Sequence, residues 1–259
     1  MSTEKRIKLN QLLRLQPPGT VFLSSWLSKH GYSLGLLKRY RNSHWLEAIG
    51  TGAMIRADDS VGYEGAIYTL QNQMASLVHP GGRTALSLLG NAHYLELSAK
   101  KVMLFGGAEE KLPIWFKNRD WGVVIDYHPT SFLPPDMGLV DVERKFFSLK
   151  VSGSVRALME CLYLAPEKQE LLECYELMES LNNVRPQLVQ SLLEACQSVK
   201  VKRLFLYLAE KTGHDWMNYL NLEKVNLGSG KRSLVEDGVY IPKYQITVPK
   251  ALEEHGKNI

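Results

Sequence analysis

The side chains best suited to reading nucleic acid lie close together in one short stretch. Lys38, Arg41 and Asn42 follow one another within five residues. Lysine and arginine donate hydrogen bonds to guanine edges, and asparagine pairs with adenine through two hydrogen bonds. In a helix these side chains share one face, and the opposite face is apolar. The spacing predicts a DNA-reading helix that packs on its neighbours through Leu36, Leu37 and Tyr40.

Neighbouring residues fit contacts to the DNA backbone. Ser33 is placed to cap the start of the same helix, where its hydroxyl and the free backbone N–H groups can meet a phosphate. The other candidates for phosphate contacts are Lys29, Arg39, Thr51 and Arg56. The alternative is a solvated helix face, because surface helices carry charges in any case. Leu34 lies on the same face and counts against the DNA-reading helix, because an exposed Leu there would have to contact a thymine methyl or an adjoining domain.

A helix-turn-helix followed by a hairpin is predicted to position these residues. Gly31 is a natural left-handed cap between the second and third helices, and Gly50-Thr51-Gly52 can make a tight turn between two strands. Three helices followed by a hairpin is the order of a winged helix-turn-helix. The expected helices span 4–16, 24–30 and 33–42, and the expected strands span 45–49 and 53–56.

Charge is distributed unevenly along the 259 residues. Residues 1–56 hold nine Lys or Arg against two Glu, a net +7. The remaining residues hold 22 Lys or Arg against 25 Asp or Glu, a net −3, so that the whole chain carries only +4. Such an asymmetry indicates that the N-terminal part meets a polyanion, and nucleic acid fits best.

The remainder of the chain predicts a mixed α/β domain. The chain is longer than the common size of one domain, roughly 100–150 residues. We therefore expect an α+β protein with a winged helix-turn-helix domain and trailing helices at 1–90 and a C-terminal effector domain at 91–259. The expected helices are 63–77, 83–90 and three within 153–212; the expected strands are 94–97, 101–105, 114–116, 122–127, 146–151, 239–241 and 244–248.

Three further motifs have a structural interpretation that outweighs the functional one. The run 228–233 resembles a phosphate-binding loop, but Val225 stands where such a loop needs Gly. An exposed turn is therefore favoured. The alternative is a second nucleic-acid contact through Lys231 and Arg232. The run 79–84 is read as a corner between helices in preference to an anion site. Asp126 and His128 would suit a metal or a general base, although a structural loop is favoured.

No cofactor, metal site or catalytic motif is expected, and the chain is not expected to be an enzyme. Cys161, Cys174 and Cys196 lie in apolar helical patterns without metal-ligand spacing and are predicted to be buried thiols. No signal peptide or membrane span is predicted, which favours a cytoplasmic location.

Several segments together resemble the AbiEi family of antitoxins. They are KLNQLL from Lys8, PGTV from Pro18, WLSKHG from Trp26, KRYRNS from Lys38, WLEAIGTGA from Trp45, PGGRTAL from Pro80, LG from Leu89, LGSGKR from Leu227 and YQITVP from Tyr244. Each motif is weak alone, but the combination is specific and spans almost the whole chain.

The resemblance implies an antitoxin and transcriptional autorepressor of a type IV toxin–antitoxin system, linked to abortive infection and phage defence. Members of the family bind inverted repeats in their own promoter through the winged helix. The C-terminal domain counters a nucleotidyltransferase-like toxin without a stable complex. The positions carried over are Lys38, Arg39, Arg41 and Asn42, with Thr51 and Arg56 on the wing. The alternative function is a nucleic-acid-acting enzyme with a nuclease-like C-terminal domain. Lys117, Asp120 and Asp126 are close in sequence, but their spacing does not match the pattern of a metal-dependent nuclease.

Overall fold

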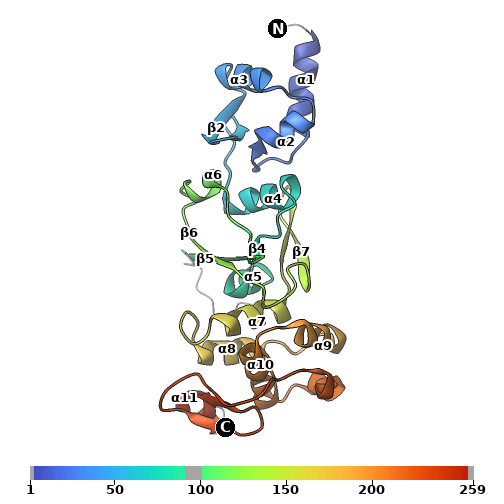
Figure 1. Ribbon diagram of the computed structural model, residues 1–259. Helices are drawn as coiled ribbons and strands as arrows, with labels where there is room; N and C mark the ends of the chain where they lie inside the picture. The colour runs from blue at the N-terminus through green and yellow to red at the C-terminus, as the bar shows by residue number, and fades with distance from the viewer. Residues whose placement is uncertain (1–2, 91–100, 256–259) are drawn as a thin grey trace. The chain divides into compact units, whose positions relative to one another are not determined.

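The computed structural model describes residues 3–90 and 101–255, which form two compact units (Figure 1). Within the described residues, unit 1 comprises 3–79, 101–129 and 141–150, and unit 2 comprises 80–90, 130–140 and 151–255. Each unit therefore draws on separate segments of the chain. The division expected at residues 90 and 91 stays a prediction, and the strand expected at 94–97 lies outside the described residues.

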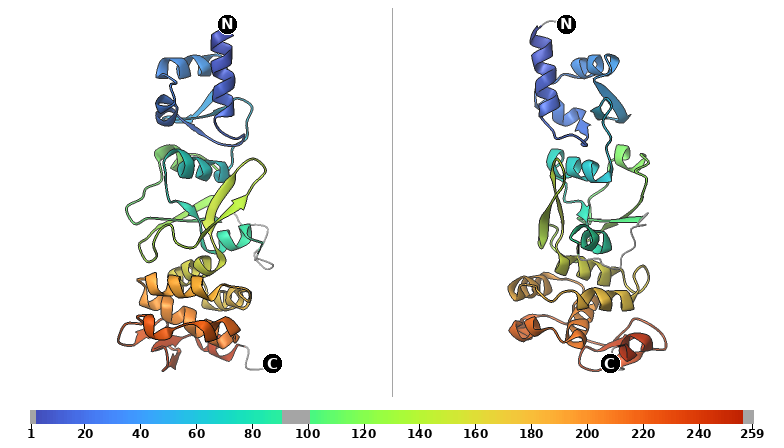
Figure 2. Two further views of the ribbon diagram at one scale, coloured as in Figure 1. Left: turned by 90° about the vertical axis from the view of Figure 1, so that its right-hand side faces the viewer. Right: turned by 180° about the vertical axis from the view of Figure 1, so that it is seen from behind.

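The N-terminal part of unit 1 is a three-helix fold with a small sheet, as predicted (Figure 2). Its core is made by one cluster of buried side chains: Leu9, Leu12, Phe22, Leu27, Tyr32, Leu36, Leu37, Tyr40, Leu46 and Met54. The antiparallel sheet has the strand order β1-β3-β2. The elements are α1 (Thr3–Arg14), β1 (Phe22–Leu23), α2 (Ser24–Lys29), α3 (Leu34–Asn42), β2 (Leu46–Gly50) and β3 (Ala53–Arg56).

The rest of unit 1 contains α4 and a second small sheet of order β4-β5-β6. Strands β5 and β6 are parallel, so the chain crosses over between them. The strand expected at 114–116 is wrong, because α6 occupies this place in the crossover. Pro113 starts that helix, its carbonyl accepting from Phe116 N at 3.0 Å. The bounds are α4 (Tyr63–Gln73), β4 (His79–Pro80), β5 (Lys101–Gly106), α6 (Ile114–Lys117) and β6 (Val124–Pro129).

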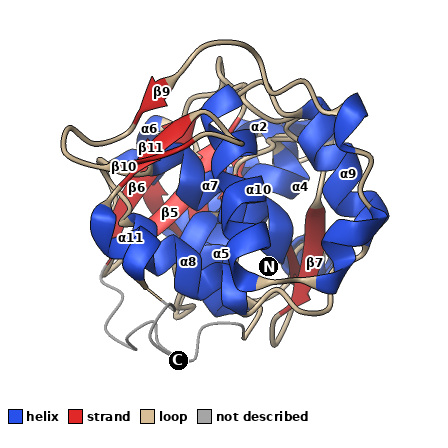
Figure 3. Cartoon of the chain, turned by 90° about the horizontal axis from the view of Figure 1, so that it is seen from below, coloured by secondary structure: helices blue, strands red, loops and turns tan. Residues whose placement is uncertain are grey.

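Unit 2 is mainly helical, and α5, α7, α8 and α10 pack together in it (Figure 3). Four helices occupy 153–212 where three were expected. The helix missed is α7, which is buried on nearly every side, including its two charged residues, Arg156 and Glu160. The helices are α5 (Gly82–Leu88), α7 (Ser154–Leu164), α8 (Leu171–Glu179), α9 (Pro186–Ala195), α10 (Val199–Thr212) and α11 (Lys250–Glu254).

Short strands and turns complete the described chain. Strands β10 and β11 are antiparallel and β11 pairs in parallel with β9, close to the extended pieces expected in the tail. A separate two-stranded sheet joins β7 to β8. The bounds are β7 (Leu139–Glu143), β8 (Ser148–Ser152), β9 (Arg232–Ser233), β10 (Val239–Ile241) and β11 (Ile246–Val248), with 3₁₀ turns η1 (Asp215–Tyr219) and η2 (Leu222–Lys224).

The three cysteines are buried free thiols, as expected. Burial raises the pKa of Cys161, Cys174 and Cys196, so that all three stay protonated and unreactive at neutral pH. No helix among residues 3–90 and 101–255 is both long enough and apolar enough to cross a membrane.

Candidate nucleic-acid interface

Helix α3 has the two faces that its sequence predicts. Leu36, Leu37 and Tyr40 are buried in the core cluster. Lys38, Arg39, Arg41 and Asn42 are exposed on the other side. Leu34 is also on the outside, with 67% of its surface exposed. The packing thus fixes one face of the helix and leaves its cations and its amide accessible to a partner.

A groove runs between α3 and the β2–β3 hairpin. It consists of two adjoining cavities of about 420 and 690 Å³, and Lys38, Arg41 and Ala48 line both. Leu34 and Gly35 line the first cavity, at the start of the helix. The second also holds two carboxylates, Glu47 and Asp58, with Asn42 and His44. The two long cations therefore lie where the helix meets the hairpin.

The start of α3 has the predicted cap. Ser33 Oγ accepts a hydrogen bond from Leu36 N at 3.3 Å, and Gly31, at φ +83°, makes the turn from α2. A hydroxyl that accepts from an N–H keeps its own hydrogen to donate. Ser33 is exposed, so it can cap the helix and donate to an anion at the same time.

The hairpin is tied to the helices at its turn. Ser24 N donates to the carbonyl oxygen of Gly52 at 2.8 Å, which joins the turn to the start of α2. Gly52 has φ +74°, a conformation that L side chains rarely adopt. Thr51 beside it is exposed, and so is Lys29 at the end of α2. Both side chains are accessible, as expected for phosphate contacts.

Arg56 has a different role from the one expected. Its guanidinium donates to the carbonyl oxygens of Leu13, Gln16 and Pro17, and to Asp59 Oδ2 at 3.4 Å. Burial lowers the pKa of Arg56 and Asp59 opposes this shift. Only 15% of the side chain is exposed. We therefore correct the phosphate contact to a structural role: Arg56 satisfies the carbonyl groups at the end of α1.

Comparison with known families decides the classification. A model described as "Transcriptional regulator, AbiEi antitoxin, Type IV TA system" matches residues 99–249, and the model of the AbiEi antitoxin N-terminal domain matches residues 5–97. The chain belongs to the AbiEi family. The predicted resemblance is confirmed over nearly the whole sequence.

Solved structures add support for the fold of this AbiEi-family chain. The crystal structure of the RV2827C protein from Mycobacterium tuberculosis aligns with a TM-score of 0.59 and 14% identity. The alignment covers 98% of this chain and 93% of that one. At such low identity the likeness shows the fold alone. A search of curated proteins gave no match.

The basic turn of the AbiEi-family chain at 228–233 is held from inside. Arg203, 2% exposed, donates to the carbonyl oxygens of Leu227, Gly228 and Gly230. These carbonyls point at a cation, whereas a phosphate-binding loop points its N–H groups at an anion. The turn interpretation therefore fits the contacts. Lys231 and Arg232 are exposed, and their contact with nucleic acid stays a prediction.

The corner at 79–84 already binds an anion of its own chain. Gly82 N, at the start of α5, donates to Glu160 Oε2 at 2.9 Å. Glu160 is fully buried and also accepts from Ser152 Oγ and from Arg156 Nε, the latter at 2.8 Å. The predicted structural interpretation fits. The signal missed in the sequence was the pair Arg156 and Glu160, four residues apart in a mainly apolar helix.

Asp126 and His128 lie on one side of β6, as their spacing requires. Asp126 Oδ2 lies 3.0 Å from His128 Nε2 and 2.8 Å from Lys101 Nζ. Burial acts to raise the pKa of Asp126, but Lys101 and His128 outweigh it and hold the pKa below its ordinary value. Within the described ranges no group of three or more His, Cys, Asp or Glu is arranged to hold a metal. The nuclease alternative thus gains no supporting observation.

Sequence reasoning missed two contributors to the groove. His44 lines its second cavity and has φ +55°, which turns the chain sharply from α3 into β2. Gly35 lines the first cavity without a side chain. No helical or strand periodicity in the sequence singles out either residue. They line the groove because α3 and the hairpin lie close together.

Proposed function

We propose that this AbiEi-family chain represses its own operon by binding inverted repeats in the promoter through α3 and the β2–β3 hairpin. Lys38, Arg41 and Asn42 contact base edges in the major groove. The residues assigned to backbone phosphates are Lys29, Ser33, Arg39 and Thr51. Family membership supports a role in transcriptional regulation, and the groove supports this surface for it.

One observation carries the proposal: within residues 3–90 and 101–255, the exposed cations of this surface form no ion pair. Among the described residues, none of the ion pairs includes Lys29, Lys38, Arg39 or Arg41. A cluster of unpaired positive charges does not stabilise the fold, because the charges repel one another. DNA phosphates would neutralise it and release counterions, which makes binding tight at low salt and weak at high salt.

A direct test measures binding of the full chain to its own promoter by fluorescence anisotropy. We expect Lys38→Ala, Arg41→Ala and Asn42→Ala each to weaken specific binding by about 1–3 kcal/mol. The matched control is the double variant Lys145→Ala, Lys168→Ala, which removes two exposed cations elsewhere and should bind almost as tightly as the wild type. No binding at low salt, or full specific affinity in the Lys38→Ala, Arg41→Ala double variant, would refute the proposal.

The second half of the proposed function is neutralisation of a nucleotidyltransferase-like toxin, without a stable complex. Its support is membership of a type IV antitoxin family. The full chain, expressed from an unrelated promoter, should rescue cells that express the toxin encoded beside it. The Lys38→Ala, Arg41→Ala variant should rescue equally well, because the neutralising role is assigned to the C-terminal region. Failure of the wild-type chain to rescue would contradict the antitoxin half alone.

A further inference from the structure

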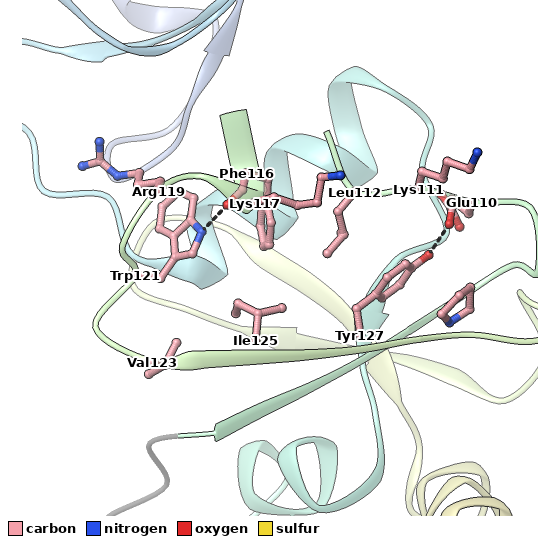
Figure 4. Close-up of a pocket in the computed structure, with 11 residues that line it drawn as sticks. Glu110, Lys111, Leu112, Phe116, Lys117, Arg119, Trp121, Val123, Ile125 and Tyr127 are labelled. Atoms are coloured by element: carbon pink, nitrogen blue, oxygen red, sulfur yellow. Dashed lines mark hydrogen bonds between the residues drawn. The ribbon is translucent and has the colours of Figure 1, made fainter. Parts of the chain in front are cut away.

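Unit 1 contains a further cavity, of about 500 Å³, whose lining includes no residue of α3 (Figure 4). It lies between the segment 110–121 and one side of β6. Its volume is within the usual range for small-molecule sites, roughly 300–1,000 Å³. The lining residues that matter are the aromatic residues Phe116, Trp121 and Tyr127 and the cations Lys111, Lys117 and Arg119.

The aromatic side chains of this pocket are held in place. Trp121 Nε1 donates to the carbonyl oxygen of Phe116 at 2.8 Å, and the Tyr127 hydroxyl donates to the carbonyl oxygen of Glu110 at 2.9 Å. Phe116 is buried beside Trp121, with ring centroids 5.2 Å apart. A preformed aromatic wall binds a flat ring by stacking and burial, at little entropic cost.

The cations of the pocket are available to a ligand. Among residues 3–90 and 101–255, none of the ion pairs includes Lys111, Lys117 or Arg119. The Arg119 Nε atom is buried and has no hydrogen-bond partner in the described chain. A buried N–H without an acceptor is costly, and a bound anion would satisfy it.

The acid that lines the pocket is engaged elsewhere. Glu110 Oε1 accepts from Ser76 Oγ and from Leu77 N, the latter at 2.8 Å, and Glu110 Oε2 accepts from Gly107 N at 3.1 Å. The Glu110 carboxylate is thus held by three hydrogen bonds from Ser76, Leu77 and Gly107. Three cations remain against one carboxylate that is already hydrogen-bonded, so the pocket favours an anion.

We propose that this pocket binds a free nucleotide, with the base against the accessible parts of Trp121 and Tyr127 and the phosphates at Lys117, whose side chain lies between Lys111 and Arg119 (Figure 4). A flat aromatic ring and several negative charges in one small molecule match the two halves of the lining. The same chemistry occurs in an unpaired nucleotide of a nucleic-acid strand. A volume of about 500 Å³ suits a single small molecule, and the experiment separates the two sources.

The pocket also adjoins the hairpin of the DNA-binding surface. Trp115, next to Phe116 on α6, approaches Gly50 so closely that a Cβ there would lie 2.7 Å from the Trp115 Cβ. Trp115 meets the edges of Phe116 and Trp121, with ring centroids 5.7 and 6.4 Å apart. This contact joins β2 to α6, the helix that supplies Phe116 and Lys117 to the pocket. The proposal itself concerns binding in the pocket and does not depend on DNA binding.

The test titrates the full chain, without DNA, by isothermal calorimetry and tryptophan fluorescence. The probes are ATP, GTP, CTP and UTP, the matching nucleosides, inorganic triphosphate and a short single-stranded oligonucleotide. We expect at least one nucleoside triphosphate to bind about tenfold or more tightly than either its nucleoside or inorganic triphosphate. The variant Lys111→Ala, Lys117→Ala, which changes only exposed side chains, should weaken that binding at least tenfold. The control Lys145→Ala should leave it unchanged.

Three outcomes would overturn the proposal. One is no nucleotide binding at millimolar concentration. Another is equal binding by wild type and the Lys111→Ala, Lys117→Ala variant. The third is tighter, Lys117-dependent binding of the oligonucleotide, which would assign the pocket to a nucleic-acid strand. Because no promoter DNA is present, these outcomes are distinguishable from failure of the proposed repressor function.

Discussion

The helix-turn-helix of unit 1 and the helical unit 2 use the same cationic residue types in opposite ways. On α3, Lys38, Arg39 and Arg41 are exposed and take part in no ion pair of the described chain. In unit 2, Arg156 and Arg203 are buried, and each is surrounded by acceptors of its own unit. A buried cation needs such partners, whereas an exposed one keeps its hydration until a ligand replaces it.

This contrast teaches that charge alone does not identify a binding surface. Arg56 belongs to the basic N-terminal segment, yet its contacts resemble those of Arg203, because both guanidiniums hold backbone carbonyls. Removing a cation of the buried kind should therefore reduce stability. Removing one of the exposed kind should reduce only binding.

The largest expected effect is on the buried Arg156–Glu160 pair. Glu160→Ala leaves the Arg156 guanidinium without its carboxylate and Gly82 N without its acceptor. We expect the free energy of unfolding to fall by about 3–5 kcal/mol, measured by urea denaturation. The control Lys150→Ala breaks an exposed pair with Asp141 and should cost at most about 1 kcal/mol. Equal effects of the two variants would break the contrast between buried and exposed charges.

Arg56→Met tests a residue that belongs to the basic N-terminal segment but is largely buried and holds backbone carbonyls, as Arg203 does. Because the guanidinium holds three carbonyl groups, we expect a loss of about 1.5–3 kcal/mol in the free energy of unfolding. The salt dependence of promoter binding, measured at a temperature where the variant is folded, should stay that of the wild type. A slope reduced by about one would restore Arg56 to the phosphate contacts.

The Asp126 cluster should give a smaller, pH-dependent effect, because half-exposed Lys101 is partly screened by solvent. The pKa of Asp126 is lower in the folded chain than its ordinary value. Its stabilisation is therefore present above the ordinary pKa and is lost as the pH falls through the lowered one. Unfolding measured from about pH 6 down to about pH 3 should show a shallower acid loss in Asp126→Asn than in wild type. Identical profiles would contradict the assignment.

The smallest effect is expected at Gly35 in α3. A Cβ there meets nothing within 4 Å, and alanine favours a helix more than glycine by roughly 0.5–1 kcal/mol. Gly35→Ala should raise the free energy of unfolding by about that amount. Gly50→Ala is the matched comparison, since its Cβ collides with Trp115 and should lower stability. If Gly35→Ala lowers the free energy of unfolding, the outer face of α3 must pack against other residues, which would contradict the assignment of this face as exposed.

Much of the N-terminal fold was predictable, because local signals there agree. Ser33 caps α3, Gly31 and Gly52 take positive φ at the turns, and the apolar stripe of α3 is the buried one. Each signal lies within a few residues of the structure that it specifies. Helix α7 and the short helix α6 escaped prediction for the opposite reason. In α7 the charged residues Arg156 and Glu160 are buried as a pair, which their sequence does not reveal, and the four residues of α6 are too few to show periodicity.

The candidate site was predictable only in part. Exposure of Lys38 and Arg41 follows from helical spacing, but the role of Arg56 depends on the end of α1, about 40 residues away in sequence. The aromatic pocket combines the loop before α6 with β6. The contacts of Arg56 join distant segments, and the pocket forms only when the segment 110–121 folds back onto β6, so neither leaves a local pattern in the sequence.

Salt dependence of promoter binding tests the central claim most directly. The dissociation constant should be measured over a series of salt concentrations for the wild type and for the Lys29→Ala, Arg39→Ala variant, which removes the two cations assigned to backbone phosphates, with both proteins confirmed as folded. The account predicts steep weakening of wild-type binding with salt, and a slope reduced by about two in the double variant for two lost cation contacts. Specific affinity should fall as well, while the free energy of unfolding stays unchanged. An unchanged slope and affinity in the double variant would contradict it.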